Sequence, residues 1–322
     1  MRLCDTALSG LIVKEVSGFY WVEAGDGHTY RCRLRGRLLE AAQSSDVAAI
    51  GDRVRFDAVP DETGRIGAIF EVEPRRTVLG RAVRTEGSRG AGDPVRQHVI
   101  IANPDAVFVV TSAVKPAPDF PLIDRLLAIA DHAELPEVVL IVNKMDLADE
   151  AKVIARFLPY ERMNYTVCYT SAEKRLGIER LRELLDGKIS VFTGASGVGK
   201  TSLLNAIQPD LGRAVKEVSG WRDEGVHTTR DSVLVRLEQG GYIADTPGIR
   251  SAALYDVEPE ELDGYFRDIA PYVGRCRFND CAHQDEPGCA VIDAVRRHEI
   301  SRARWRSYLA LREELTKALE AY

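Results

Sequence analysis

The stretch Gly194-Ala-Ser-Gly-Val-Gly-Lys-Thr201 constrains this chain more than any other. It lies between a β-branched and aromatic run, residues 188–193, and the helix-forming residues 202–207, which is the context of a phosphate-binding loop. Glycines let successive backbone N–H groups turn toward a phosphate, and the positive end of the following helix dipole adds to the attraction. Lys200 can reach the outermost phosphates, and Thr201 is placed to hold Mg²⁺. The predicted contacts to a nucleoside polyphosphate are Gly194, Ala195, Ser196, Gly197, Val198, Gly199, Lys200, Thr201 and Ser202.

Length and charge limit the remaining possibilities. A chain of 322 residues is too long for one compact core and suits two or three domains. Because there is no apolar run of about 18 residues and no signal-peptide core at the start, we expect a cytoplasmic protein without a membrane segment. The net charge of -6 argues against a protein that coats nucleic acid over its whole surface. Any such binding must come from local patches.

Residues 1–74 contain short alternating segments separated by turn signals. Strands are expected at 10–16, 18–22, 29–34, 51–56 and 66–72, which favours a small closed barrel of the oligonucleotide-binding (OB) type. Arginines recur at every second position, which on a strand places them on one face. They are Arg31, Arg33, Arg35 and Arg37, with Phe19, Tyr20, Trp21 and Tyr30 nearby. This face fits a groove that follows a phosphate backbone and stacks bases, and a solvated barrel face is the alternative.

The middle of the chain changes character twice. Residues 75–97 are rich in arginine and glycine without a hydrophobic period, so we predict a mobile basic linker that offers a second contact to nucleic acid. Over 98–256, strand and helix patterns alternate, which predicts an α/β fold with a mostly parallel sheet covered on both faces. Strands are expected at 99–102, 106–110, 138–142, 165–168, 232–237 and 242–244, and helices at 122–133, 149–158, 178–185 and 201–207, with a polar loop after the last helix.

Two short motifs that follow strands indicate guanine as the base. Asn143-Lys-Met-Asp146 comes directly after a strand, at the edge where open α/β sheets bind ligands. The carboxylate of Asp146 can accept from both the ring N–H and the exocyclic amine of guanine, and adenine offers no such pair. Asn143 would brace the loop, and the Lys144 stem would pack along the base. Thr170-Ser-Ala172 matches a third loop, in which Ser171 and backbone N–H groups near Ala172 would meet the guanine oxygen.

Residues that could sense the terminal phosphate follow the phosphate loop. Asp245-Thr-Pro-Gly248 ends a predicted strand, so Asp245 can hold Mg²⁺ through water and the Gly248 N–H can contact a γ-phosphate. In the preceding loop, Thr228 or Thr229 would complete the Mg²⁺ shell, and the sequence leaves this choice open. The order is unusual because the guanine motifs precede the phosphate loop. A circular permutation that keeps strand neighbours but moves the termini explains it.

Residues 257–322 carry a different kind of site. Cys276, Cys281, His283 and Cys289 fall within 14 residues, and three thiolates with one imidazole suit a closed, structural Zn²⁺ site. The alternative is three buried thiols with an incidental histidine. A helix is expected near 260–269, and a second helix over 301–321 carries several arginines. A phosphate-contacting face and a solvated face are both open for that second helix.

These residues together resemble ribosome small subunit-dependent GTPase A, a circularly permuted bacterial GTPase family. The resemblance rests on Gly51-Asp-Arg-Val54, the permuted motifs, His227-Thr-Thr229 and the cysteine and histidine spacing, and it covers nearly the whole chain. It implies an OB-fold domain (1–74), a basic linker (75–97), a permuted GTPase domain (98–256) and a helical zinc domain (257–322). It also implies action in late maturation of the 30S subunit, with 16S rRNA as partner, one Zn²⁺ per chain, and Mg²⁺ with GTP. Arg230 and Ile249-Arg-Ser-Ala-Ala-Leu254 depart from the usual pattern around the switches.

The catalytic residues follow from a departure at position 249. Many GTPases place a water-orienting glutamine directly after the Asp245–Gly248 motif, and Ile249 has no donor or acceptor for that task. His227 is the candidate for orienting water, against a histidine that only packs, while Lys200 and Thr229 would stabilise the reacting phosphates. We expect a monomer with slow intrinsic hydrolysis, accelerated by the subunit. A nucleotide-gated RNA-binding module and an ATPase or kinase are the competing functions, and Asp146 argues against the last.

Overall fold

The computed structural model describes residues 7–36, 38, 46–59, 65–83, 96–219, 232–245 and 257–320. These residues belong to two compact units, each of which has its own core. Unit 1 draws on residues 1–105, 185–192 and 208–251, and unit 2 on residues 106–184, 193–207 and 252–322. Strand β11 (Ile189–Gly194) contributes residues to both units. The domain limits expected from the sequence remain predictions.

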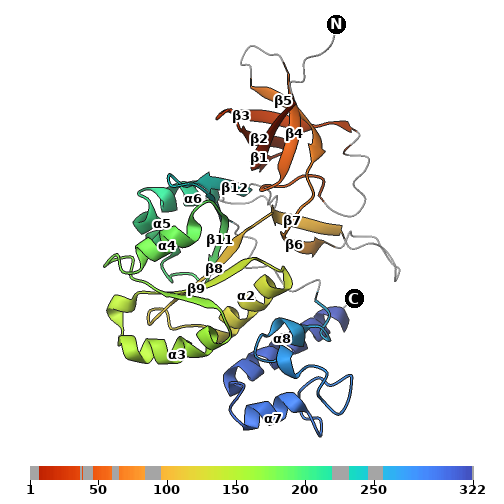
Figure 1. The fold of residues 1–322 in the computed structure, drawn as a ribbon, viewed down its shortest axis with the longest axis vertical. Helices are drawn as coiled ribbons and strands as arrows, with labels where there is room; N and C mark the ends of the chain where they lie inside the picture. Colours follow the sequence, from red (N-terminus) through yellow and green to blue (C-terminus); the bar gives the residue numbers. More distant parts are fainter. Residues whose placement is uncertain are drawn as a thin grey trace. The chain divides into compact units, whose positions relative to one another are not determined.

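A closed barrel of five strands forms the first part of unit 1 (Figure 1). Its strands are β1 (Ala7–Val16), β2 (Phe19–Ala24), β3 (Thr29–Leu34), β4 (Arg53–Val59) and β5 (Ile66–Val72). The barrel closes because β1 pairs with both β2 and β4, while β3 pairs in parallel with β5. Side chains alternate along β3, so that Tyr30 and Cys32 point into the core and Arg31 and Arg33 point outward. This barrel confirms the sequence prediction.

Two further predictions for unit 1 need correction. Strands β6 (Val78–Val83) and β7 (Arg96–Ala102) pair antiparallel, so both ends of the predicted linker are strands, and residues 84–95 lie outside the described residues. Leu79, Val99 and Ile101 are buried. The apolar alternation is short and lies among arginines, so the sequence pattern did not indicate strands. The expected polar loop after residue 207 instead contains helix α6 (Leu211–Ser219), because Leu211 and Val215, four residues apart, are buried on one face.

The rest of unit 1 extends its sheet. Strand β13 (Tyr242–Asp245) runs parallel to β11, and β12 (Ser232–Arg236) pairs antiparallel with β13. The other edge of β12 pairs with β1 of the barrel through Lys14 opposite Val233 and Glu15 opposite Ser232. The order of the strands in this unit is therefore β11-β13-β12-β1-β2-β3-β5-β4.

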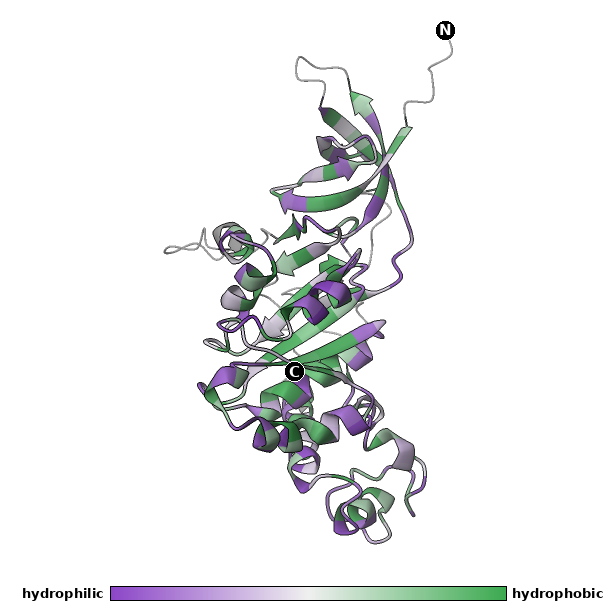
Figure 2. Cartoon of the chain, turned by 60° about the vertical axis from the view of Figure 1, so that its left-hand side comes forward, coloured by the Kyte–Doolittle hydropathy of each residue, from purple (hydrophilic) through white to green (hydrophobic). Residues whose placement is uncertain are grey.

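Unit 2 contains three parallel strands with helices around them. The strands β8 (Ala106–Ser112), β9 (Glu137–Asn143) and β10 (Thr166–Tyr169) pair in the order β8-β9-β10. The helices are α2 (Phe120–His132), α3 (Glu150–Arg162), α4 (Ile178–Leu185) and α5 (Lys200–Ile207). Every residue of β8 is buried, as expected for a strand covered on both faces. Figure 2 shows strands that are mainly hydrophobic, whereas the helices also carry hydrophilic residues.

The last part of unit 2 is helical. It contains the 3-10 segments η3 (Leu262–Tyr265) and η4 (Ala270–Tyr272) and the helices α7 (Ala290–Arg296) and α8 (Arg302–Glu320). The helix expected near 260–269 is thus wrong, since Gly264 and Pro271 disfavour a continuous α-helix there. Helix α8 packs against α2 (Figure 1). Among the described helices, none combines the length and the apolarity that crossing a bilayer requires.

Candidate functional site

The phosphate-binding motif forms the turn between β11 and α5, as predicted. Gly194 adopts a φ of +136°, and a Cβ there would lie 2.1 Å from the carbonyl oxygen of Val110, so only glycine fits. Gly199 has a φ of +98°, and its Cβ would lie 2.4 Å from Nδ2 of Asn143. The glycine spacing therefore allows this loop to approach strand β8 and the Asn143 motif closely.

Lys200 begins α5 and folds back over the loop. Its ammonium group donates to the carbonyl oxygens of Gly194 and Ala195, with N to O distances of 2.9 and 2.7 Å. The side chain thus spans the loop that would surround a phosphate. Thr201 and Ser202, in the first turn of α5, are exposed. Ser196 and Gly197 are also exposed, whereas Val198 is buried and anchors the loop.

The Asn143 motif follows β9 and is tied to the phosphate loop. The Asn143 side chain is buried, and its Nδ2 donates to the carbonyl of Val198 at 3.0 Å. Lys144 adopts a left-handed φ of 63°, and its ammonium donates to the carbonyls of Gly197, at 2.7 Å, and Lys115. A short 3-10 segment, η1 (Met145–Leu147), then leaves Asp146 exposed.

The Thr170–Ala172 loop lies beside this motif, at the end of β10. The hydroxyl of Ser171 donates to the carboxylate of Asp146. The side-chain oxygen of Asn143 accepts from the backbone N–H of Ala172 and from the hydroxyl of Thr170, both at 3.3 Å. Three motifs separated in sequence therefore meet at one edge of the sheet, where the strands end.

Of the predicted switch residues, only Asp245 belongs to the part of the chain that the structure describes. Asp245 is the last residue of β13, beside Val233 of β12, and its side chain is not described. His227, Thr228, Thr229 and Gly248 lie outside the described residues. Their assignments remain predictions.

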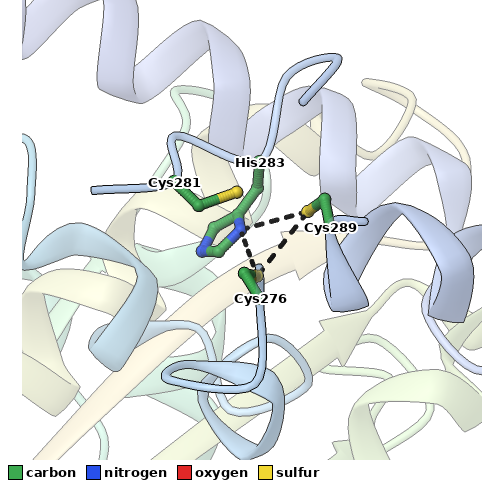
Figure 3. A group of neighbouring side chains, drawn as sticks. All are labelled: Cys276, Cys281, His283 and Cys289. Atoms are coloured by element: carbon green, nitrogen blue, oxygen red, sulfur yellow. Dashed lines mark hydrogen bonds between the residues drawn. The ribbon is translucent and has the colours of Figure 1, made fainter. Parts of the chain in front are cut away.

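The predicted metal ligands do come together. The ligand atoms of Cys276, Cys281, His283 and Cys289 all lie within 4.8 Å of one another, and Figure 3 shows the four side chains facing a common centre. The Sγ atoms of Cys276 and Cys289 are 3.8 Å apart, and Nδ1 of His283 lies 3.5 and 3.3 Å from them. A tetrahedral Zn²⁺ with ordinary bond lengths requires edges of about 3.8 Å between two sulfurs and about 3.5 Å between sulfur and nitrogen. Three thiols and one imidazole are a donor set that suits zinc, and the three distances among Cys276, His283 and Cys289 match these edges.

Residues around this cluster hold the ligands in place. Nε2 of His283 contacts the carboxylate of Asp263 at 3.1 Å, which leaves Nδ1 to face the thiols. The carboxylate of Glu286 accepts from the backbone N–H groups of Ala282 and Gln284 at 2.7 and 2.8 Å. Burial alone would raise the pKa of Glu286, but these backbone donors outweigh it and lower the pKa. No spacing rule relates Asp263 to the cysteines, so the sequence did not reveal it.

Arg304 does not belong to the phosphate-contacting or solvated face predicted for α8, and both alternatives stay open for the exposed Arg302 and Arg306. It is only 4% exposed, and its guanidinium contacts Asp124 of α2 at 2.5 Å and both carboxylate oxygens of Asp268 at 2.9 and 3.0 Å. Burial disfavours the charged guanidinium, but the two carboxylates more than compensate and raise the pKa of Arg304. Arg312 also approaches a carboxylate, that of Glu260, at 3.6 Å, whereas Arg302 and Arg306 are exposed.

The arginines of β3 do lie on one exposed face of the barrel. The guanidinium groups of Arg31 and Arg33 lie 5.3 and 4.2 Å from the ring centre of Phe19. Arg35 is also exposed and pairs with Asp57, while Arg37 lies outside the described residues. Tyr20 and Tyr30, expected to stack bases, are instead buried in the barrel core. The exposed face thus carries Arg31, Arg33 and Arg35 with two partly buried aromatic side chains, Phe19 and Trp21, the latter opposite Arg31 in the strand pairing.

Comparisons with known proteins cover the whole molecule. The model of the RsgA GTPase family matches residues 72–255, and that of the RsgA N-terminal domain matches residues 9–66. The protein named small ribosomal subunit biogenesis GTPase RsgA of Chlorobaculum tepidum is 40% identical over 311 residues, which cover 96% of this chain and 99% of that protein. The protein of the same name from Moorella thermoacetica is 38% identical over 309 residues, or 96% and 97% of the two chains.

Two solved structures are also similar to this chain over nearly its full length. The crystal structure of YjeQ from Thermotoga maritima matches with a TM-score of 0.74 and 36% identity, over 96% of this chain and 99% of that one. YloQ, described as a circularly permuted GTPase, matches with a TM-score of 0.73 and 28% identity over 99% of both chains. The predicted fold class, a barrel followed by a permuted GTPase fold and a C-terminal cysteine and histidine cluster, is confirmed.

Proposed function

Because this chain belongs to the RsgA family of GTPases, we propose that it hydrolyses GTP during biogenesis of the small ribosomal subunit. The observation that carries the proposal is the meeting of three motifs around one site. Asn143 contacts both the phosphate loop, at Val198, and the Thr170–Ala172 loop. A base and a chain of phosphates bound together would need these loops in fixed relative positions.

In this proposal Asp146 reads the base. Its carboxylate is exposed and is oriented by the hydroxyl of Ser171, so it can accept from the ring N–H and the amine of guanine. The backbone near Ala172 supplies the donor for the guanine oxygen. Asn143 acts indirectly, since its buried amide connects the loops. The stem of Lys144 lines the base pocket, because its ammonium group is held at Gly197.

Residues 194–202 bind the phosphates. Backbone N–H groups of the loop and the N-terminus of α5 face the phosphates, and Lys200 exchanges its carbonyl partners for phosphate oxygens. Thr201, Asp245 and one of Thr228 and Thr229 would hold Mg²⁺, which neutralises charge on the β- and γ-phosphates when bound. Gly248 would sense the γ-phosphate through its N–H. Lys200 and Thr229 would stabilise the phosphoryl group as it transfers.

The barrel and the metal domain supply the contacts to the ribosomal subunit. Arg31 and Arg33, whose guanidinium groups both lie over the ring of Phe19, offer charge and a stacking surface to 16S rRNA of the 30S subunit. One structural Zn²⁺ per chain would be held by the cluster at Cys276, Cys281, His283 and Cys289. The chain acts as a monomer in the cytoplasm.

We expect the subunit to accelerate hydrolysis because no water-orienting glutamine follows the Asp245–Gly248 motif. Ile249 cannot orient water, so we infer that His227 does so when the subunit is bound. The test is GTP turnover with purified 30S, 50S and 70S particles, for the parent and for His227→Ala and Lys200→Ala. The parent should be stimulated by 30S, by as much as about 10³ if the subunit completes the site.

The two variants separate binding from chemistry. His227→Ala should lose most of the stimulated rate at nearly unchanged GTP affinity, whereas Lys200→Ala should lose both. Stimulation of His227→Ala as strong as that of the parent would assign the catalytic role to the ribosome or the backbone. A parent that no particle stimulates would instead favour an RNA-binding module in which hydrolysis is incidental.

A further inference from the structure

Two arginines cap the far end of the helix that starts in the phosphate loop. Helix α5 has only eight residues, and its last carbonyls lack partners within the helix. Arg182 of α4 donates to the carbonyl of Ile207 through Nε at 3.0 Å and Nη2 at 2.5 Å, and Nη2 also lies 3.4 Å from the carbonyl oxygen of Ala206. Arg175 donates from Nη2 to the carbonyl of Ala206 at 3.1 Å. Positive charge is favourable at this end because the helix dipole is negative there.

Arg175 belongs to the loop that carries Ser171 and Ala172. The backbone groups of Ser171 and Leu176 bond to each other at 3.1 and 3.0 Å, which closes residues 171–176 into a compact loop. Arg175 sits in that loop with a φ of +54°, a conformation that side chains other than glycine and asparagine seldom adopt. The left-handed backbone at Arg175 costs conformational free energy, and the hydrogen bond from its side chain to α5 offsets part of that cost.

The contact of Arg175 closes a series of contacts that joins the loops of the nucleotide site to one another. The phosphate loop is joined to Asn143 at Val198, and Asn143 is joined to the Ala172 loop. Arg175 joins that loop to the end of α5, and α5 leads back to the phosphate loop through Lys200. Without Arg175, Asn143 would still link the guanine-contacting loop to the phosphate loop. Arg182 would still contact the end of α5, but it belongs to α4 and not to the guanine-contacting loop.

We propose that Arg175 is a positioning residue that sets the distance between the guanine-contacting loop and the phosphate loop. This inference rests on the proposed function, because it assigns Ala172 to the base. Ligands that span both loops should depend on Arg175. Ligands that touch only the phosphate loop should not.

The test compares Arg175→Asn, Arg175→Lys and Arg180→Gln with the parent. Asparagine tolerates the left-handed backbone but cannot reach Ala206, and lysine restores a cation that can. Arg180 is the matched control, because it is an exposed arginine nearby whose guanidinium pairs with Glu183 on its own helix. For each protein, GDP affinity, competition by inorganic tripolyphosphate, and the KM and kcat for GTP are measured.

Arg175→Asn should bind GDP about three- to tenfold more weakly and raise the KM for GTP equally, which is the typical net effect of one lost hydrogen bond. Its tripolyphosphate affinity and kcat should match the parent, Arg175→Lys should recover part of the loss, and Arg180→Gln should behave like the parent. Equal GDP affinity in Arg175→Asn and the parent would overturn the inference, as would equal losses for GDP and tripolyphosphate. If the parent itself bound no GDP, the proposed function would fail instead.

Discussion

The nucleotide site and the metal cluster are built in opposite ways. The first joins three loops spread over residues 143–202, and most of its internal bonds end on backbone carbonyls, as at Val198, Gly194 and Ala195. The second takes four side chains from 14 residues, and its ligand atoms lie against one another. The side chains of Asn143 and Lys200 therefore have hydrogen-bond partners within the nucleotide site itself. The cluster brings three thiols and an imidazole together with few partners besides each other.

This difference predicts different responses to loss of the ligand. A site closed by backbone hydrogen bonds keeps its shape without nucleotide, because the buried Asn143 side chain that joins its loops already has its partners. Neighbouring thiolates repel one another unless a cation lies between them. The free energy of metal binding is therefore largely folding free energy for the surrounding segment. Removal of the metal should be far more damaging locally than removal of the nucleotide.

Metal removal should give the largest effect. Cys281→Ser, or chelation of the native protein, should unfold much of residues 257–320, because structural zinc contributes about 10 kcal/mol or more to small domains. GDP binding should stay largely intact, and 30S binding should weaken. Metal analysis should find one zinc per native chain, and native protein without zinc would contradict the assignment. Cys168→Ser, at a buried cysteine away from the cluster, is the control for loss of a thiol.

Arg304 should show an intermediate effect, since it fastens α8 to α2. Arg304→Met leaves the carboxylates of Asp124 and Asp268 buried without their cation, which should lower the free energy of unfolding by about 3–5 kcal/mol. The measurement is urea denaturation followed by circular dichroism. Arg306→Met, on the exposed face of the same helix, should change it little. Equal midpoints for the two variants would show that the buried network contributes no stability.

Asp263 should show the smallest effect. Asp263→Ala removes the carboxylate that orients His283, so zinc affinity should fall about 10- to 100-fold in competition with a chromophoric chelator. Nucleotide affinity should not change. Asp285→Ala is the control, because that acidic residue is exposed and lies only two positions from His283. Unchanged zinc affinity in Asp263→Ala would mean that the ligand cluster orients itself.

The sequence revealed the features that depend on spacing along the chain. The glycines of the phosphate loop and the residues from Cys276 to Cys289 follow patterns of local spacing, so the sequence predicted where the loop turns and which side chains come together. The barrel strands follow from alternation, as in β3, where buried Tyr30 and Cys32 separate exposed arginines. Residues 220–231 and 246–256 lie outside the described residues, so the switch predictions are untested.

Features that depend on partners distant in sequence were not predictable. Arg304 and Arg31 look alike in the sequence, yet one meets Asp124 and Asp268 in the core and the other lies beside Phe19 at the surface. Nothing in the local pattern distinguishes them, because the deciding carboxylate of Asp124 is 180 residues away. The contact from Arg175 to Ala206 and the orientation of His283 by Asp263 escaped prediction for the same reason.

The central claim, that three loops form a guanine-specific site with Asp146 reading the base, is tested most directly by Asp146→Asn. The amide can donate to the carbonyl oxygen that xanthine carries in place of the guanine amine, so preference should move from GTP to xanthosine triphosphate. Competition between the two nucleotides is measured for the parent and the variant, with Asp149→Asn as a control at an exposed helix cap. The account predicts reversal of the preference in Asp146→Asn alone. Full retention of GTP preference in that variant would contradict it.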